Sequence, residues 1–192
     1  MDGDKLFAVY LGGRARGCNT ELHDMVFVTG PSVEAAYDQL LDKWFGLPQR
    51  LHIDAWAELD VIDGHQVSLS AEPDPGVRRL FFVNLGGYRP GELSEVHANG
   101  FLVAETRDEA KRRAKTSLIQ GGVTELHTDD LYEVDTCLEL GAVNGRHVVL
   151  TPTDRAGELK VHGSYQPLPK AVGVSTTWRP FTAPSSRHVS TS

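Results

Sequence analysis

The clearest element that the sequence predicts is a strand over residues 51–61, with one face on the protein core. Apolar and polar residues alternate along it, so successive side chains point to opposite faces. The apolar set is Leu51, Ile53, Ala55, Ala57, Leu59 and Val61, and the other set is His52, Asp54, Trp56, Glu58 and Asp60. Two shorter apolar runs, 5–11 and 79–85, are each followed by a glycine pair and predict buried first strands.

This pattern of apolar and polar residues occurs twice in the chain. Residues 6–45 align with 80–119 at an offset of 74, and residues 51–60 align with 126–135 at an offset of 75. A repeat of this length indicates one supersecondary unit that is used twice. Because units of about 70 residues bury little of their surface when alone, we expect the two copies to share one core.

Each copy also predicts one helix and one tight hairpin. In the first copy, Ser32 is expected to cap a helix whose apolar residues recur at three- and four-residue steps. In the second copy, Thr106 and Glu109 match a capping box at the start of the helix. Asp63-Gly64 and Asn144-Gly145 predict two-residue turns, because a type I′ hairpin needs positive φ at both positions.

Together these elements predict an α+β protein made of two tandem ββαββ repeats packed with pseudo-twofold symmetry. The sheet is expected to be mainly antiparallel, either continuous or as two facing sheets, with one helix in each repeat. The repeats are expected at 1–71 and 79–162, with a linker at 72–78. Residues 163–192 are rich in Ser, Thr, Pro and Gly and carry no acid, so we expect a flexible C-terminal tail.

Composition and charge narrow the range of partners and locations. The 192-residue chain has a formal net charge of −7, which disfavours nucleic acid as a partner because phosphate binding needs a basic surface. No apolar stretch approaches the ~20 residues of a membrane helix, and the acidic start is unlike a secretory signal. Cys18 and Cys137 do not correspond between the copies, so no disulfide framework is expected. We therefore predict a cytoplasmic protein whose partner is a small molecule or a protein; the oligomeric state is left open.

The repeated unit resembles a known protein family. The motifs LGG, E-x-H and LH-x-D occur together and in order in the segments KLFAVYLGGRARGCNTELHDMVFV and LHIDAWAELD. These segments are similar to the bacterial family known as domain of unknown function 1543, whose members carry one or two copies of such a unit. The resemblance covers roughly residues 5–69 and 79–150 and implies a two-copy member. It implies no activity, and no functional residue is carried over from it.

Acidic and histidine pairs that recur in both copies form the first candidate site. Residues two apart on a strand project from the same face, as E-x-H and H-x-D require. If the second and third strands are neighbours, each copy gathers two imidazoles and several carboxylates, which suit a divalent transition metal such as zinc, iron or manganese. The candidate ligands are Glu21, His23, His52, Asp54, Glu95, His97, His127 and Asp129. The simpler interpretation, which we favour, is a polar strand face in water with histidines hydrogen-bonded to Glu or backbone.

The glycine pairs form a second candidate, an anion site. A turn that points consecutive N–H groups inward binds anions, and nearby arginines add positive charge. The residues concerned are Gly12, Gly13, Arg14, Arg16, Gly86 and Gly87. A phosphate loop, however, leads into a helix and not into a strand, so a sharp turn or a close backbone contact is the simpler interpretation.

The sequence contains no nucleophile–base pair and no cofactor fingerprint. We therefore expect a non-catalytic module that binds a small ligand or a partner, or that regulates one. The alternative is a metal-dependent enzyme that uses the repeated Glu-x-His and His-x-Asp pairs. A basic run on the second helix is expected to be a solvated face.

Overall fold

In a computed structural model of the chain, residues 3–87, 91, 93–120 and 133–169 are described. The first repeat contains β1 (Lys5–Arg14), β2 (Leu22–Gly30), η1 (Glu34–Ala36), α1 (Tyr37–Lys43), β3 (Leu47–Glu58), β4 (Val61–Ile62) and β5 (His65–Ser70). The second contains β6 (Arg79–Gly87), β7 (Val96–Ala104), α2 (Arg107–Gln120), β8 (Glu133–Glu139), β9 (Ala142–Val143) and β10 (Arg146–Pro152). A further strand, β11 (His162–Pro167), follows the second repeat.

Each repeat therefore has the order ββαβββ among its described elements, one strand more than the sequence suggested. The predicted third strand, 51–61, is divided between β3 and the two-residue strand β4. The division has a topological reason, because β3 pairs within one sheet and β4 within another. At the crossing point the Leu59 N–H still bonds the Leu6 carbonyl at 2.9 Å, which ties the crossover to β1.

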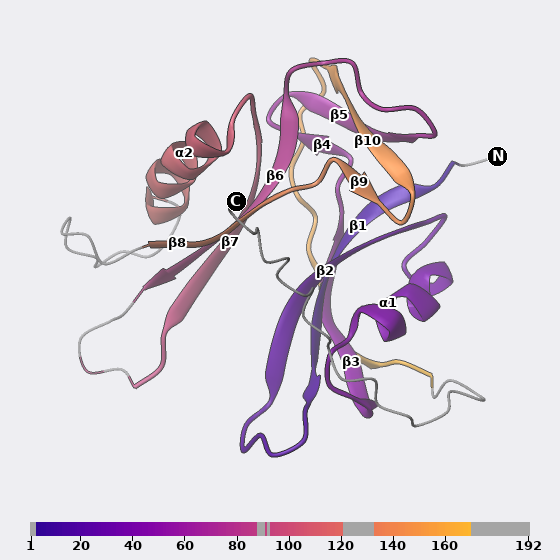
Figure 1. Ribbon diagram of the computed structural model, residues 1–192, viewed down its shortest axis with the longest axis vertical. Coiled ribbons are helices and arrows are strands. Elements are labelled where there is room, and N and C mark those ends of the chain that lie inside the picture. The colour runs from indigo at the N-terminus through magenta and orange to yellow at the C-terminus, as the bar shows by residue number, and fades with distance from the viewer. Residues whose placement is uncertain (1–2, 88–90, 92, 121–132, 170–192) are drawn as a thin grey trace, which may run out of the picture.

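The described strands form three sheets, and every pairing among them is antiparallel. Sheet A has the order β11-β3-β1-β2, sheet C has the order β7-β6-β8, and sheet B has the order β4-β5-β10-β9. Sheets A and C diverge from the region of sheet B, and α1 and α2 lie on their outer sides (Figure 1). The sheet is thus neither continuous nor only two-layered, since a third sheet is built from the hairpins of both repeats.

Sheet B relates the repeats symmetrically. Its order reads the same from either end when β4 and β5 are exchanged with β9 and β10. The register agrees, because Ser68 of β5 pairs with Val149 of β10, its own equivalent in the other hairpin. The predicted turns at the two hairpins are confirmed, with φ of 50° at Asp63 and 49° at Asn144 followed by glycines of positive φ.

Each hairpin turn also contacts the other repeat. The Asp63 carboxylate accepts hydrogen bonds from the Val103 N–H at 2.9 Å and from the Arg113 guanidinium of α2 at 2.7 Å. In the reverse direction, Asn144 donates to the side chain of Gln39 on α1, which in turn bonds the backbone of β2. We call these two sets of contacts the reciprocal clasp. It links the hairpin of each repeat to the helix of the other.

The buried side chains of the described residues form three hydrophobic clusters between these layers. One lies beneath α1 on sheet A and another beneath α2 on sheet C. The third takes Leu6, Phe27 and Leu59 from the first repeat and Phe82 and Leu140 from the second. Because this cluster contains residues of both copies, the repeats share a core, as their small size led us to expect.

The helix starts follow the predicted capping chemistry. Ser32 Oγ accepts a hydrogen bond from the Ala35 N–H at 3.3 Å, ahead of η1 and α1. Thr106 Oγ1 accepts from the Glu109 N–H at 3.2 Å, and the Glu109 carboxylate reaches back to the Glu105 N–H at 3.0 Å. Neither helix in the described part of the chain is long and apolar enough to cross a membrane.

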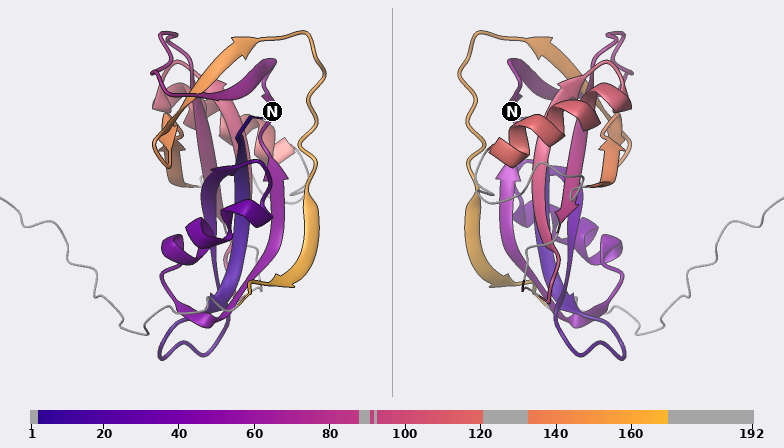
Figure 2. Two further views of the ribbon diagram at one scale, coloured as in Figure 1. Left: turned by 90° about the vertical axis from the view of Figure 1, so that its right-hand side faces the viewer. Right: turned by 90° about the vertical axis from the view of Figure 1, so that its left-hand side faces the viewer.

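The C-terminal segment departs from the predicted tail, which was expected from residue 163. His162–Pro167 forms β11, which pairs with β3 at the edge of sheet A (Figure 2). Ring contacts and the buried side chain of Leu168 hold this segment, although its composition is typical of a flexible one. The rest of the predicted tail, 170–192, lies outside the described residues.

Candidate functional site

Four of the predicted ligand residues meet in the first repeat. Glu21 directly precedes β2, His23 is the second residue of β2, and His52 and Asp54 lie on β3. The strand between them is β1, where Gly12 pairs with His23 on one side and with His52 on the other. The predicted neighbours β2 and β3 are therefore separated by β1. We call Glu21, His23, His52 and Asp54 the first-repeat cluster.

Gly12 explains how side chains from two non-adjacent strands reach each other. A Cβ atom at Gly12 would lie 2.4 Å from His52 Nε2 and 2.5 Å from Asp54 Oδ2. Any larger residue would therefore displace the imidazole or the carboxylate. The glycine allows the side chains of His52 and Asp54 to approach the backbone of β1 closely. A close backbone contact was the simpler of the two interpretations of the glycine pairs.

The distances within the cluster are short. His52 Nε2 lies 3.3 Å from Glu21 Oε1 and 3.3 Å from Asp54 Oδ1, and His23 Nε2 lies 3.1 Å from Asp54 Oδ2. The His52 side chain is only 2% exposed, whereas those of Glu21, His23 and Asp54 are 46%, 35% and 30% exposed. A buried imidazole is thus surrounded by three groups that water reaches.

The direction of the His52 ring is set by the backbone. Its Nδ1 lies 2.9 Å from the Arg50 carbonyl, and since a carbonyl only accepts, we assign the proton to Nδ1. Nε2 then faces the two carboxylates, and it is buried without an aligned hydrogen bond. Asp54 Oδ2 is also buried without one, because its contact with His23 has the distance of an ion pair but not the direction of a hydrogen bond.

Asp54 reaches the cluster through a β-bulge. Tyr10 pairs with Ala55 and Leu11 pairs with Ile53, so Asp54 is the extra residue between them. A bulge bends its strand and redirects a side chain, and bulges are frequent beside functional sites. The bulge gives a reason for the convergence of the H-x-D pair that simple alternation does not provide.

Aromatic rings flank the cluster on both sides. Tyr165 of β11 lies against His52 with ring centroids 4.3 Å apart, and Tyr10 stacks on His23 at 5.1 Å. The pKa of Tyr10 is raised by burial first, and then by the nearby carboxylates Asp54 and Asp24. Tyr10 is therefore a phenol that keeps its proton at neutral pH.

The second repeat corrects the sequence alignment of the third strands. Gly86 pairs with Glu133, as Gly12 pairs with His52, and the bulge in β8 falls at Asp135. Glu133 and Asp135, and not His127 and Asp129, thus hold the register positions of His52 and Asp54. The similarity at an offset of 75 was misleading because the second copy has about six more residues than the first ahead of its hairpin turn, and these residues precede β8.

The other predicted ligands of the second repeat are placed only in part. Glu95 Oε2 lies 3.5 Å from His97 Nε2, so these two side chains contact each other, whereas in the first repeat Glu21 contacts His52 and His23 contacts Asp54. His127 and Asp129 lie outside the described residues. Among the residues that are described, no three His, Cys, Asp or Glu side chains are already arranged to hold a metal ion.

The predicted anion site depends on turns that the structure replaces with strand. Gly12, Gly13 and Arg14 continue β1, and Gly86 and Gly87 are the last residues of β6. Gly13 instead allows Trp44 to approach, since a Cβ there would lie 2.7 Å from the indole ring. Extended residues paired to neighbouring strands do not form an anion-binding nest, and the loop residue Arg16 has no such nest to complete.

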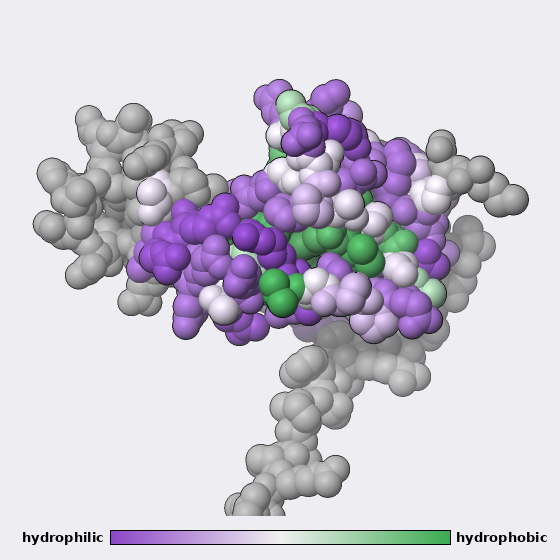
Figure 3. Space-filling view, turned by 90° about the horizontal axis from the view of Figure 1, so that it is seen from above, coloured by the Kyte–Doolittle hydropathy of each residue, from purple (hydrophilic) through white to green (hydrophobic). Residues whose placement is uncertain are grey.

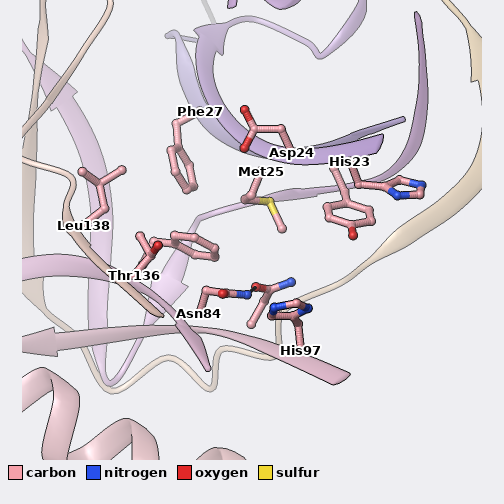
Figure 4. Close-up of a pocket in the computed structure, with 11 residues that line it drawn as sticks. His23, Asp24, Met25, Phe27, Asn84, His97, Thr136 and Leu138 are labelled. Carbon is pink, nitrogen blue, oxygen red and sulfur yellow. Dashed lines mark hydrogen bonds between the residues drawn. The ribbon is translucent and has the colours of Figure 1, made fainter. Parts of the chain in front are cut away.

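A pocket that sequence reasoning missed lies between the repeats. It has a volume of about 380 Å³, and we call it the inter-repeat cleft. Its lining consists of Tyr10, His23, Asp24, Met25 and Phe27 from the first repeat and Phe82, Asn84, His97, Asn99, Thr136 and Leu138 from the second. Figure 4 shows Met25 on one wall and Asn84, His97 and Thr136 on the facing wall. The repeated histidines gave a signal for it, because His23 and His97 hold equivalent positions.

One lining residue differs from the rest in its direction. Asp24 alternates with His23 and Met25 along β2, and its carboxylate points away from Asn84 and His97 (Figure 4). Burial raises the pKa of Asp24. The carboxylate is thus a partly buried charge beside the cleft and not a group that faces its interior.

The basic residues of α2 do not form a candidate binding site. Arg113 pairs with Asp63 at 2.7 Å and approaches Glu109 at 3.9 Å, so it belongs to the reciprocal clasp. The end of the molecule that α2 occupies is hydrophilic, and hydrophobic residues gather toward the middle of the same face (Figure 3). The exposed part of this helix therefore has the character of a solvated face.

Comparisons with known proteins place the chain in a family. No curated protein matches it. The crystal structure of a protein Il1583 from Idiomarina loihiensis is similar, with 34% identity and a TM-score of 0.69, over 87% of this chain and 99% of that chain. The family model described as Domain of Unknown Function (DUF1543) matches twice, at residues 18–69 and 92–142. Since these matches cover more than half of the sequence, the chain belongs to the DUF1543 family, as a member with two copies of the domain.

Proposed function

We propose that the protein is a non-catalytic module that binds a small molecule in the inter-repeat cleft. The observation that carries this proposal is that equivalent residues of both repeats, His23 with His97 and Met25 with Asn99, line one hollow. Its volume of about 380 Å³ lies within the range of small-molecule sites. A duplicated fold thus supplies two walls that a single unit lacks.

The lining indicates the chemistry of the ligand. Phe27, Phe82, Met25 and Leu138 provide apolar contact, and none of the described lining residues is a Lys or Arg. The Asn84 amide donates to Asn99 Oδ1 at 2.7 Å, which leaves further donors and acceptors on this wall for a ligand. These groups favour an uncharged molecule with an apolar part and several hydrogen-bonding atoms.

The two walls differ in a way that would orient such a molecule. Tyr10 and Met25 of the first repeat correspond to Asn84 and Asn99 of the second. The first wall therefore offers an aromatic face and a thioether, and the second offers amides. We expect the apolar part of the ligand to lie on the first repeat and its polar part on the second.

A screen of small neutral molecules by ligand-observed NMR on the full chain tests this proposal. Hits should lose binding in Asn84→Ala and Asn99→Ala and keep it in Asn19→Ala, a loop asparagine outside the cleft. Hits that bind all three variants equally, or no hits at all, would count against the cleft as a binding site.

A second candidate function is the metal-dependent enzyme suggested by the repeated pairs. The observation that favours it is that His23 both lines the cleft and contacts Asp54 of the first-repeat cluster. An ion held by the cluster would lie beside a bound molecule. Chemical change of cleft ligands only in metal-loaded protein, followed by NMR, would support this candidate over simple binding.

A further inference from the structure

We propose that the first-repeat cluster, Glu21, His23, His52 and Asp54, is a binding site for a divalent transition-metal ion at the edge of the inter-repeat cleft. The inference is separate from the proposed function, since the ion would bind whether or not the cleft holds a small molecule. It rests on the direction of His52, the spacing of the donor atoms and the way the backbone is built around them.

His52 is oriented as a metal ligand usually is. Its Nδ1–H donates to the Arg50 carbonyl at 2.9 Å, and a backbone carbonyl in this position fixes the tautomer that leaves Nε2 free to bind. That Nε2 is buried, has no aligned hydrogen bond and faces oxygens of Glu21 and Asp54 at 3.3 Å. The Nε2 lone pair and the two carboxylates repel one another, so this arrangement is unfavourable unless a cation lies among them.

The spacing of the donors suits such a cation. Adjacent ligand atoms around an ion with bonds of about 2.0–2.2 Å lie about 2.8–3.6 Å apart, with the shorter spacing in octahedral sites and the longer in tetrahedral sites. The three contacts of the cluster, at 3.1, 3.3 and 3.3 Å, fall in this range. They form a chain of pairs, and no three donors among the described residues yet surround one point. Glu21 and His23 are 46% and 35% exposed, so a rotamer change can close the set around the fixed His52.

The backbone supports the same arrangement. Gly12 leaves the space that His52 Nε2 and Asp54 Oδ2 occupy, and the bulge at Asp54 brings its carboxylate to the side of His52. The second repeat has a glycine at position 86, the E-x-H pair Glu95 and His97, and an aspartate at its bulge. Glu133 takes the register position of His52, so only one of the four donor positions has changed type.

The donor set also indicates which ions fit. Two imidazoles with two carboxylates favour Zn²⁺, Mn²⁺ or Fe²⁺ over Mg²⁺ and Ca²⁺, which prefer oxygen ligands. We therefore expect Zn²⁺ to bind more tightly than Mg²⁺ to the untagged, chelator-stripped full chain. Titration calorimetry with Zn²⁺, Mn²⁺ and Mg²⁺ alone measures this order directly.

Variants of the two exposed ligands assign the site without threatening the fold. Glu21→Gln and His23→Gln should each weaken Zn²⁺ binding by more than about tenfold, and together they should abolish the rise in melting temperature that Zn²⁺ produces. The matched control is His65→Gln. The Nδ1 of His65 is likewise held by a carbonyl two residues earlier, at 2.8 Å, but no ion pair with it is found in the described part of the chain. This variant should bind Zn²⁺ as the natural chain does.

Each outcome decides the proposal. Tight Zn²⁺ binding that disappears in the Glu21→Gln, His23→Gln double variant supports it. No binding of Zn²⁺ or Mn²⁺ would overturn it. Binding that survives in the double variant but is lost in Glu95→Gln, His97→Gln would also overturn it, by placing the ion in the second repeat. None of these results alters the cleft-ligand test, which depends on Asn84 and Asn99.

Discussion

The two repeats share a scaffold and differ in the chemistry placed on it. Both have a glycine at the end of the first strand, an E-x-H pair on the second and a bulged aspartate on the third. The first repeat adds His52, which is buried and oriented by a carbonyl, where the second has Glu133. The backbone geometry that gathers polar side chains is therefore common to both copies, whereas the type of ligand side chain differs between them.

The outer edges of the two main sheets differ as well. In sheet A the edge beside β3 is covered by β11, whereas in the described part of sheet C no strand lies outside β8. Tyr165 and His162 of β11 contact His52 and Trp56. The covered edge is thus the one that carries the complete first-repeat cluster, and β11 is part of the environment that buries His52.

The largest loss of stability should come from a variant that tests whether the segment at β11 belongs to the core of the first repeat. Leu168 is 8% exposed and packs in the cluster beneath α1. Leu168→Ala should lower the free energy of unfolding by at least ~2 kcal/mol because it leaves a cavity. Denaturant titration measures the change, with the surface variant Leu159→Ala as the control. A loss no greater than that of the control would show that β11 is not an integral strand.

A somewhat smaller loss of unfolding free energy is expected when a side chain at position 12 fills the space that His52 and Asp54 occupy. Gly12→Ala places a Cβ within 2.5 Å of His52 and Asp54 and should cost about 1–3 kcal/mol by overpacking. Gly163→Ala in β11 is the matched control, since nothing lies within 4 Å of its Cβ position. Thermal unfolding of the two variants should separate them clearly, and equal melting temperatures would contradict the close approach.

The reciprocal clasp can be tested by giving one repeat the residue of the other. Asp63→Asn keeps a side chain that tolerates the positive φ of the turn but removes the charge opposite Arg113. The free energy of unfolding should fall by about 0.5–1.5 kcal/mol, as for one partly exposed hydrogen bond. Adding Arg113→Gln, which copies Gln39, should cost less in this background than alone. Strict additivity would mean that the two side chains do not interact.

The smallest effect concerns Asp24, whose position in the second repeat is held by Ala98. Burial raises the pKa of Asp24, so its charged form disfavours the folded state and stability falls as pH rises through the titration of this group. Asp24→Asn should therefore raise the melting temperature at neutral pH, and the gain should shrink as the pH falls through the raised pKa of Asp24 and be lost below about pH 4. Melting curves from pH 3 to 7 check this, and a gain that grows on acidification would show the opposite sign.

Sequence reasoning reached the features that depend on local chemistry. The turns at Asp63 and Asn144 and the cap at Thr106 follow from short-range rules. The family membership followed from the order of three motifs. These features need no knowledge of which strands pair.

The features that sequence reasoning missed depend on pairing between strands that are far apart in the chain. The register of β8 is set by its pairing with β6, and local similarity placed it six residues too early. The composition around β11 resembles a tail, and only its contacts with β3 make it a strand. The inter-repeat cleft exists because sheets A and C diverge, and no spacing within one copy encodes that angle.

Whether the two repeats jointly form one binding site is tested most directly by a chemical-shift map. The map is recorded on the full chain bound to a cleft ligand found by NMR screening. We predict that the amide shifts change together on both walls, at Tyr10 and Met25 of the first repeat and at Asn84 and Asn99 of the second. Changes confined to one repeat, or centred on the basic face of α2, would contradict a site built jointly by the two copies.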